Sequence, residues 1–187
     1  MSKTVQPIRD RGKIEEMREH LKLKSYRDYF LFEMGINVGL RIGDLVKLKV
    51  SDVYRKKAII FKDEKSEKNK RVPLSLHIRE VIEEYVDRTK LDDNDWLFAS
   101  RKRTGKNNGH ITRVQAYRIL NKAAKELDLD EIGTHSLRKT FGYHYYQNYK
   151  DVAMLQELFG HSAPSITLRY IGINDEMIEK SLENFSI

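Results

Sequence analysis

Apolar residues recur at helical spacing through most of the chain. In the first such stretch, Ile14, Met17 and Leu21 fall on one face of a helix that we expect over residues 10–22. The next stretch begins at Ser25, a residue type that caps helix N-termini, and carries a dense run of aromatic and aliphatic residues. Helices with one apolar face are also expected over residues 75–86, 112–127, 135–149 and 151–159.

A short sheet is expected between these helices. Residues 57–61 (KAIIF) predict a strand, and the charged residues 62–69 predict a hairpin loop. Residues 70–74 (KRVPL) predict a returning edge strand, where Pro73 is tolerated because its missing N–H faces no partner. The sequence therefore predicts a mainly α fold with a small antiparallel β-sheet (α+β).

The pattern indicates one domain with two short appendages. The domain is expected over residues 10–173, and residues 1–9 are expected to be a flexible lead. Residues 174–187 predict a tail helix whose apolar stripe consists of Met177, Ile178, Leu182 and Phe185.

Composition excludes several classes of protein. With 187 residues, of which 40% are hydrophobic, the chain suits one folded domain with a sizeable core. No apolar run approaches the ~20 residues of a membrane span, and the first residues lack the apolar core of a secretory signal. The chain has no cysteine, which excludes disulfides and thiolate chemistry and fits a reducing cytosol.

The net charge of +7 is concentrated in two zones. Residues 47–71 contain ten basic and four acidic residues, and residues 101–125 contain eight basic and no acidic ones. The rest of the chain is therefore acidic on balance. Two basic zones on such a background favour a surface that binds a polyanion, although a pair of solvated lysine-rich loops would give the same pattern.

A tyrosine near the end of the chain is the candidate nucleophile. Tyr170 stands nine residues after His161 and directly after Arg169. A phenol titrates near pH ~10, so tyrosine is a poor nucleophile at neutral pH. Attack by Tyr170 would need cations around its target and a base near its hydroxyl.

Arg41 is the first candidate cation. It lies in the glycine-flanked stretch 39–44, which predicts a turn into a short helix reaching Leu48. Glycines let the backbone approach a ligand closely, and Asp44 can orient the arginine. An ordinary helix-start arginine paired with Asp44 would look the same.

The remaining candidates are equally ambiguous one by one. His135 and Arg138 stand three residues apart and share a helix face, but a cap and a surface charge often have this spacing. Lys65 can be a solvated hairpin lysine, and His161 can be a capping or core histidine.

Together these residues supply the groups that a single reaction, phosphoryl transfer, would need. Phosphoryl transfer needs cations on the non-bridging oxygens, an acid for the leaving oxygen and an activated nucleophile. Arg41 and Arg138 can clamp a phosphate, and Lys65 can protonate a departing 5′-oxygen. His135 or His161 can manage the phenolic proton. Such an arrangement requires no metal.

Four segments carry a resemblance to a known family. They are GLRIGDL (39–45), KSEKNKRVPL (65–74), HSLRKTF (135–141) and FGHSAPSITLRY (159–170). In their order, spacing and identity they resemble the catalytic domain of the tyrosine recombinases, the phage-integrase-like and Xer-like site-specific recombinases. The resemblance covers about residues 26–173.

This resemblance implies an activity. Tyr170 would attack a DNA phosphodiester, leaving a 3′-phosphotyrosyl link and a free 5′-hydroxyl, and a partner strand's 5′-hydroxyl would reverse the attack. The bond energy is conserved, so neither ATP, nor a metal, nor any other cofactor or small-molecule substrate is expected. The catalytic residues implied are Arg41, Lys65, His135, Arg138, His161 and Tyr170.

The implied partners are double-stranded DNA and further copies of the chain. Recombination would take place in a tetramer, with the tail docking on a neighbouring protomer or, alternatively, packing on its own core. We expect a cytoplasmic, nucleoid-associated protein without a membrane partner. The residues expected to contact DNA are Lys62, Lys68, Lys70, Arg71, Arg101, Lys102, Arg103, Lys106, Arg113 and Lys139.

The sequence departs from the family pattern in three respects. Lys139 follows Arg138 where the family often has a second histidine, and Phe159 stands where leucine is usual. Only about 25 residues precede the catalytic pattern, whereas family members usually carry an N-terminal DNA-clamping domain.

Two other functions and one conformational expectation accompany this interpretation. A type IB-like topoisomerase would use the same chemistry to release torsion, and a non-catalytic DNA-binding module would keep the fold alone. The glycine, proline and small residues around Tyr170 favour a mobile segment, so we expect Tyr170 to be held away from the arginines until a partner docks.

Overall fold

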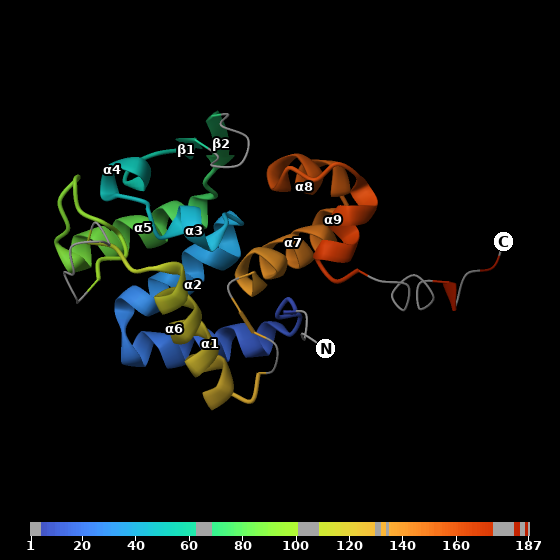
Figure 1. Cartoon of the computed structure of the whole chain (residues 1–187), viewed down its shortest axis with the longest axis horizontal. Coiled ribbons are helices and arrows are strands. Elements are labelled where there is room, and N and C mark those ends of the chain that lie inside the picture. The colour runs from blue at the N-terminus through green and yellow to red at the C-terminus, as the bar shows by residue number, and fades with distance from the viewer. Residues whose placement is uncertain are drawn as a thin grey trace.

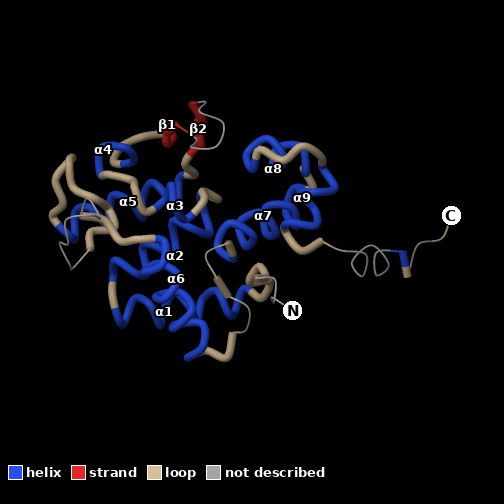
Figure 2. Tube along the Cα trace, viewed as in Figure 1, coloured by secondary structure: helices blue, strands red, loops and turns tan. Residues whose placement is uncertain are grey.

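The fold is known from a computed structural model, which describes residues 5–62, 69–100, 109–129, 132–133, 135–173, 182–183 and 186. Helices dominate, and the strands lie at one end of the molecule (Figures 1 and 2). The elements are α1 (Arg11–Lys24), α2 (Tyr26–Val38), α3 (Ile42–Leu45), α4 (Val50–Val53), β1 (Ala58–Lys62), β2 (Asn69–Pro73), α5 (Leu76–Thr89), α6 (Arg113–Glu126), α7 (Ser136–Tyr149), α8 (Val152–Phe159) and α9 (Pro164–Tyr170).

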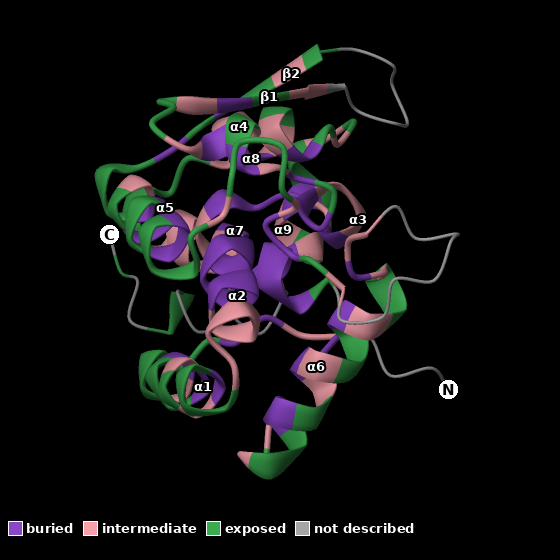
Figure 3. Cartoon of the chain, turned by 90° about the vertical axis from the view of Figure 1, so that its left-hand side faces the viewer, coloured by how far each residue is buried: buried purple, intermediate pink, exposed green. Residues whose placement is uncertain are grey.

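Helices α2 and α7 form the centre of the molecule. Helix α2 packs against α1, α5, α6 and α7, and both central helices are buried along much of their length (Figure 3). The two helices meet at Gly35, where an added Cβ would lie 2.3 Å from a Leu137 methyl. This close approach holds the start of α7 against the main core.

The predicted helix ends agree with the structure where side chains cap them. Asp10 accepts a hydrogen bond from Gly12 N at 2.6 Å, and Thr112 and Gln115 form a reciprocal capping box. Gly160 ends α8 with a positive φ of 67°, a conformation that suits glycine. Local signals therefore fix these boundaries.

The strands form the expected two-stranded antiparallel sheet. Ile59 pairs with Val72, and both side chains are buried. The next pair, Ile60 and Arg71, lies on the opposite face and is exposed. The predicted fold class is confirmed.

Helices α8 and α9 form a separate small unit on α7. Its core consists of Leu155, Phe159 and Ile171, distinct from the main core. Gly142 of α7 permits the contact, because a Cβ there would lie 2.6 Å from Ile171 and 2.9 Å from Phe159. The end of the chain that bears Tyr170 is thus attached mainly through α7.

Two expectations about chain segments need correction. The short helix after Arg41 ends at Leu45 rather than near Leu48, and the separate helix α4 follows it. Residues 5–9 were expected to be a flexible lead, but Ile8 is buried and its N–H donates to Thr140 Oγ1 at 2.9 Å. The cause is that Ile8 is part of the main hydrophobic core.

Of the predicted tail stripe, Met177, Ile178 and Phe185 lie outside the described residues. Leu182, its remaining member, is exposed. Among the helices that the structure describes, none is both long enough and apolar enough to cross a membrane.

Candidate active site

Tyr170 is the last residue of α9, a regular helix rather than a mobile segment. Pro164 occupies the first turn, where its fixed φ and missing N–H suit a helix start. Thr167 is fully buried on this helix, and its Oγ1 lies 3.0 Å from Nδ1 of His161. The helix and this contact fix Tyr170 relative to His161.

Two groups from α7 lie next to the Tyr170 hydroxyl. Nδ1 of His135, at the N-cap of α7, is 3.3 Å from it, and the Arg138 guanidinium donates a hydrogen bond to it. Burial raises the pKa of Tyr170, whereas the charges of Arg138 and Arg41 oppose that rise. The expectation that Tyr170 is held away from the arginines was wrong. Its helix docks on α7, and the buried guanidinium there offers donors to its oxygen.

Arg138 is a buried cation with fixed partners. Its Nη1 donates to the Gly39 carbonyl at 2.6 Å, and its Nη2 donates to the Phe159 carbonyl at 3.1 Å. Burial lowers the pKa of Arg138 to about 10, so the guanidinium stays protonated at neutral pH. Asp44 supports the charge, and Arg41 opposes it. The site thus holds a permanent positive charge at the Tyr170 hydroxyl.

His135 is the better-placed base of the two histidines. Burial, followed by neighbouring cations, lowers its pKa, so the imidazole is neutral at neutral pH. A neutral imidazole can accept the Tyr170 proton at Nδ1. The His161 ring instead lies edge-on to Tyr170, with ring centroids 5.1 Å apart, and its Nδ1 is paired with Thr167.

Arg41 is brought to the same site from another part of the chain. It is the N-cap residue of α3, and its charge acts on the pKa of Arg138, His135 and Tyr170. The structure therefore brings together five of the six predicted residues. Lys65, the sixth, lies outside the described residues.

The basic residues expected to contact DNA fall into three groups. Arg71 and Arg113 are exposed, and Lys70 is half-buried with its Nζ 3.2 Å from where a Gly160 Cβ would stand. Lys139 is only 7% exposed and its Nζ donates to the Val5 carbonyl at 2.8 Å, which corrects its assignment to the DNA-facing surface. Outside the described residues or side chains lie Lys62, Lys68, Arg101, Lys102, Arg103 and Lys106.

Several partners in the site were not predicted from the sequence. The carbonyls of Gly39 and Phe159 hold Arg138, and backbone atoms leave no signature in a sequence. Thr167 was also missed, although its place one helical turn before Tyr170 would put it on the same helix face.

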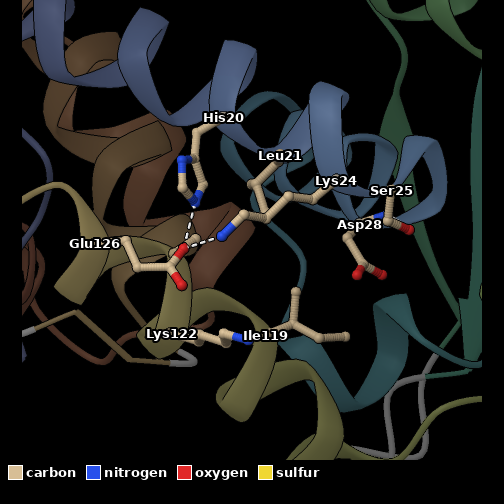
Figure 4. Close-up of a pocket in the computed structure, with 9 residues that line it drawn as sticks. His20, Leu21, Lys24, Ser25, Asp28, Ile119, Lys122 and Glu126 are labelled. Carbon is tan, nitrogen blue, oxygen red and sulfur yellow. Dashed lines mark hydrogen bonds and ion pairs between the residues drawn. The ribbon is translucent and has the colours of Figure 1, made fainter.

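A hollow between α1 and α6 contains none of the predicted catalytic residues (Figure 4). It encloses about 210 Å³. His20 and Lys24 of α1 both reach Glu126 of α6, with His20 Nε2 2.7 Å from the carboxylate. These contacts join the two helices. Within the described residues, no group of three or more histidine or acidic side chains is arranged to hold a metal ion.

Comparison with known proteins identifies the family. Residues 10–177 match the model of the phage integrase family. The chain belongs to the phage integrase family. A member of similar length is the probable integrase/recombinase YoeC of Bacillus subtilis, which is 46% identical over 97% of both chains. Tyrosine recombinase XerA of Thermococcus onnurineus is 30% identical over 90% of this chain and 60% of its own length. The chain thus spans little more than half of such longer family members.

Solved structures share the fold of this phage integrase family member. The crystal structure of XerA recombinase superposes with a TM-score of 0.73 at 22% identity, covering 97% of this chain and 64% of that one. XerH recombinase bound to a palindromic difH substrate gives a TM-score of 0.74 at 19% identity, covering 98% and 54%. A lambda integrase dimer bound to a COC′ core site gives 0.70 at 17% identity, covering 94% and 62%.

Proposed function

We propose that the chain is a site-specific DNA recombinase whose nucleophile is Tyr170. The observation that carries the proposal is the contact of the Tyr170 hydroxyl with both His135 Nδ1, at 3.3 Å, and the Arg138 guanidinium. A phenol between a neutral imidazole and a fixed cation has a base for its proton and a charge for the developing phosphorane.

The proposed reaction balances without an external energy source. A bond forms between Tyr170 Oη and the phosphorus, and the bond from phosphorus to the 5′-oxygen breaks. His135 takes the phenolic proton, and Lys65 gives a proton to the leaving 5′-oxygen. Arg41 and Arg138 hold the non-bridging oxygens, while His161 lies beside the Tyr170 ring. Attack by a partner strand's 5′-hydroxyl completes strand exchange.

We further propose that the reaction takes place on double-stranded DNA, in the nucleoid, within a tetramer held by the tail. The structures of XerH and lambda integrase contain DNA, which supports the substrate class. The exposed Arg71 and Arg113 support a basic face. The relatives are named as recombinases and integrases, which favours strand exchange over the relaxation expected of a topoisomerase.

A nicked suicide duplex tests the proposal. Duplexes tiled across the DNA that flanks the coding sequence carry a nick just beyond the cleavage position, so that the short fragment bearing the free 5′-hydroxyl diffuses away and the adduct accumulates. The parent should form a covalent adduct that Tyr170→Phe does not form. DNA binding without adduct would support a non-catalytic module. Relaxation of a plasmid carrying the same sites, without recombinant products, would support a topoisomerase.

A further inference from the structure

Residues 5–9, the N-terminal strap, lie along the first turns of α7. Val5 contributes its carbonyl to Lys139 Nζ at 2.8 Å. Ile8 donates its N–H to Thr140 Oγ1 at 2.9 Å, and its carbonyl lies 2.9 Å from His144 Nε2. These three contacts fix the position of the strap along α7.

The strap also touches the two chain segments that carry His135 and Tyr170. Arg9 donates to the Gly172 carbonyl at 3.2 Å, two residues beyond Tyr170. Gly172 has a positive φ of 80°, and a Cβ there would lie 2.6 Å from Arg9 Nη2. At the other end, a Cβ on Gly133 would lie 2.8 Å from a Val5 methyl, two residues before His135.

Lys139 links the strap to the nucleophile itself. Its buried ammonium lies 5.2 Å from the centroid of the Tyr170 ring while it donates to the Val5 carbonyl. A buried ammonium needs such an acceptor, because an unpaired buried charge is costly. The strap therefore fixes where this cation stands beside the phenol.

We propose that Arg9 and Lys139 are positioning residues, through which the N-terminal strap sets the separation of Tyr170 from His135. The inference rests on the proposed function only for its effect on rate. The structural part of the inference, a strap that holds the phenol in place, stands independently of the reaction.

The test compares Arg9→Met with Arg11→Met. Both changes remove one arginine near the start of the chain, but Arg11 contacts Asn148, on the last turn of α7, and not the Gly172 turn. At saturating nicked duplex, Arg9→Met should lower the rate constant of adduct formation about tenfold, a fraction of the ~100-fold loss that follows a 1 Å misplacement. The Kd for DNA should stay within twofold, and Arg9→Lys, which keeps a donor, should recover most of the rate.

A second measurement needs no DNA. With 13C-labelled tyrosine, the Tyr170 ring signal is assigned from the Tyr170→Phe variant. Arg9→Met and Lys139→Met should shift that signal, and Arg11→Met should leave it in place. An unshifted signal in folded Arg9→Met would overturn the inference, as would an unchanged rate constant or a change in Kd alone. A parent that forms no adduct, with the signal still shifted by Arg9→Met, would instead refute only the proposed function.

Discussion

The guanidinium carbon of Arg138 stands 4.3 Å from the centroid of the Phe159 ring, while the same guanidinium donates to the Phe159 carbonyl. One residue thus supports the cation through both its π face and its backbone. Since Phe159 is also part of the small core of α8 and α9, the position of Arg138 is coupled to the packing of the unit that carries Tyr170.

Phe159→Leu should separate the contribution of the Phe159 ring face from that of its backbone carbonyl. Leucine keeps much of the apolar volume and the backbone carbonyl, but it loses the ring face under Arg138. We expect a loss of about 1–2 kcal/mol in the free energy of unfolding, against about 3–5 kcal/mol for Phe159→Ala. Urea unfolding of the three proteins measures this difference. Equal losses in the two variants would mean that the ring face, and not the apolar volume, accounts for the whole loss.

Gly39→Ala should destabilise the protein and disturb Arg138. Gly39 has a φ of +67°, and an added Cβ would lie 2.6 Å from the Phe141 ring. The strained backbone and the clash should cost about 1–3 kcal/mol. Because the Gly39 carbonyl accepts from Arg138, adduct formation should fall as well.

Gly43→Ala is the matched control for this substitution. A Cβ at Gly43 meets no atom within 4 Å, and alanine favours the short helix α3. Its free energy of unfolding should stay within about 0.5 kcal/mol of the parent. A comparable loss in both variants would show that glycine flexibility, rather than the clash with Phe141, is what this stretch requires.

Sequence periodicity was sufficient to predict most helices and the two paired strands. It failed where long-range packing decides. Lysine is seldom buried, so nothing in the sequence placed Lys139 under the strap. The small residues before Tyr170 suggested a mobile segment. Helix α9 forms nevertheless, because contacts with α7 and His161 stabilise it rather than its own helix propensity, and such contacts are not visible in the sequence. Backbone acceptors such as the Gly39 carbonyl carry no residue signature at all.

The pH dependence of adduct formation should report His135. Burial and the cations around it lower the pKa of His135 from 6.5, so its neutral form persists into mildly acidic solution. At subsaturating DNA, where the profile reports the free protein, the rate should rise with pH, with its inflection below pH 6.5. The cations concerned are Lys139, Arg138, Arg113 and Arg41.

Lys139→Met should move that inflection to higher pH. Lys139 contributes the largest of the charge effects on His135, and its removal makes protonation easier. Lys122→Met, an exposed change on α6, should leave the inflection where it is. If both variants keep the parent profile, the titrating group is not His135, and the role of base would have to be reassigned.

The assignment of Lys65 as the general acid leads to a test by chemical rescue. Lys65→Ala should lower adduct formation on ordinary nicked DNA by about 100-fold or more, because an alkoxide leaves poorly without a proton. A duplex with sulfur in place of the bridging 5′-oxygen should restore the rate, since a thiolate departs unprotonated. Arg138→Ala serves as the control: the sulfur substitution should not rescue it, because its deficit lies in holding the phosphate. Rescue of both variants would mean that leaving-group departure limits the reaction generally, and rescue of neither would assign the proton to another residue.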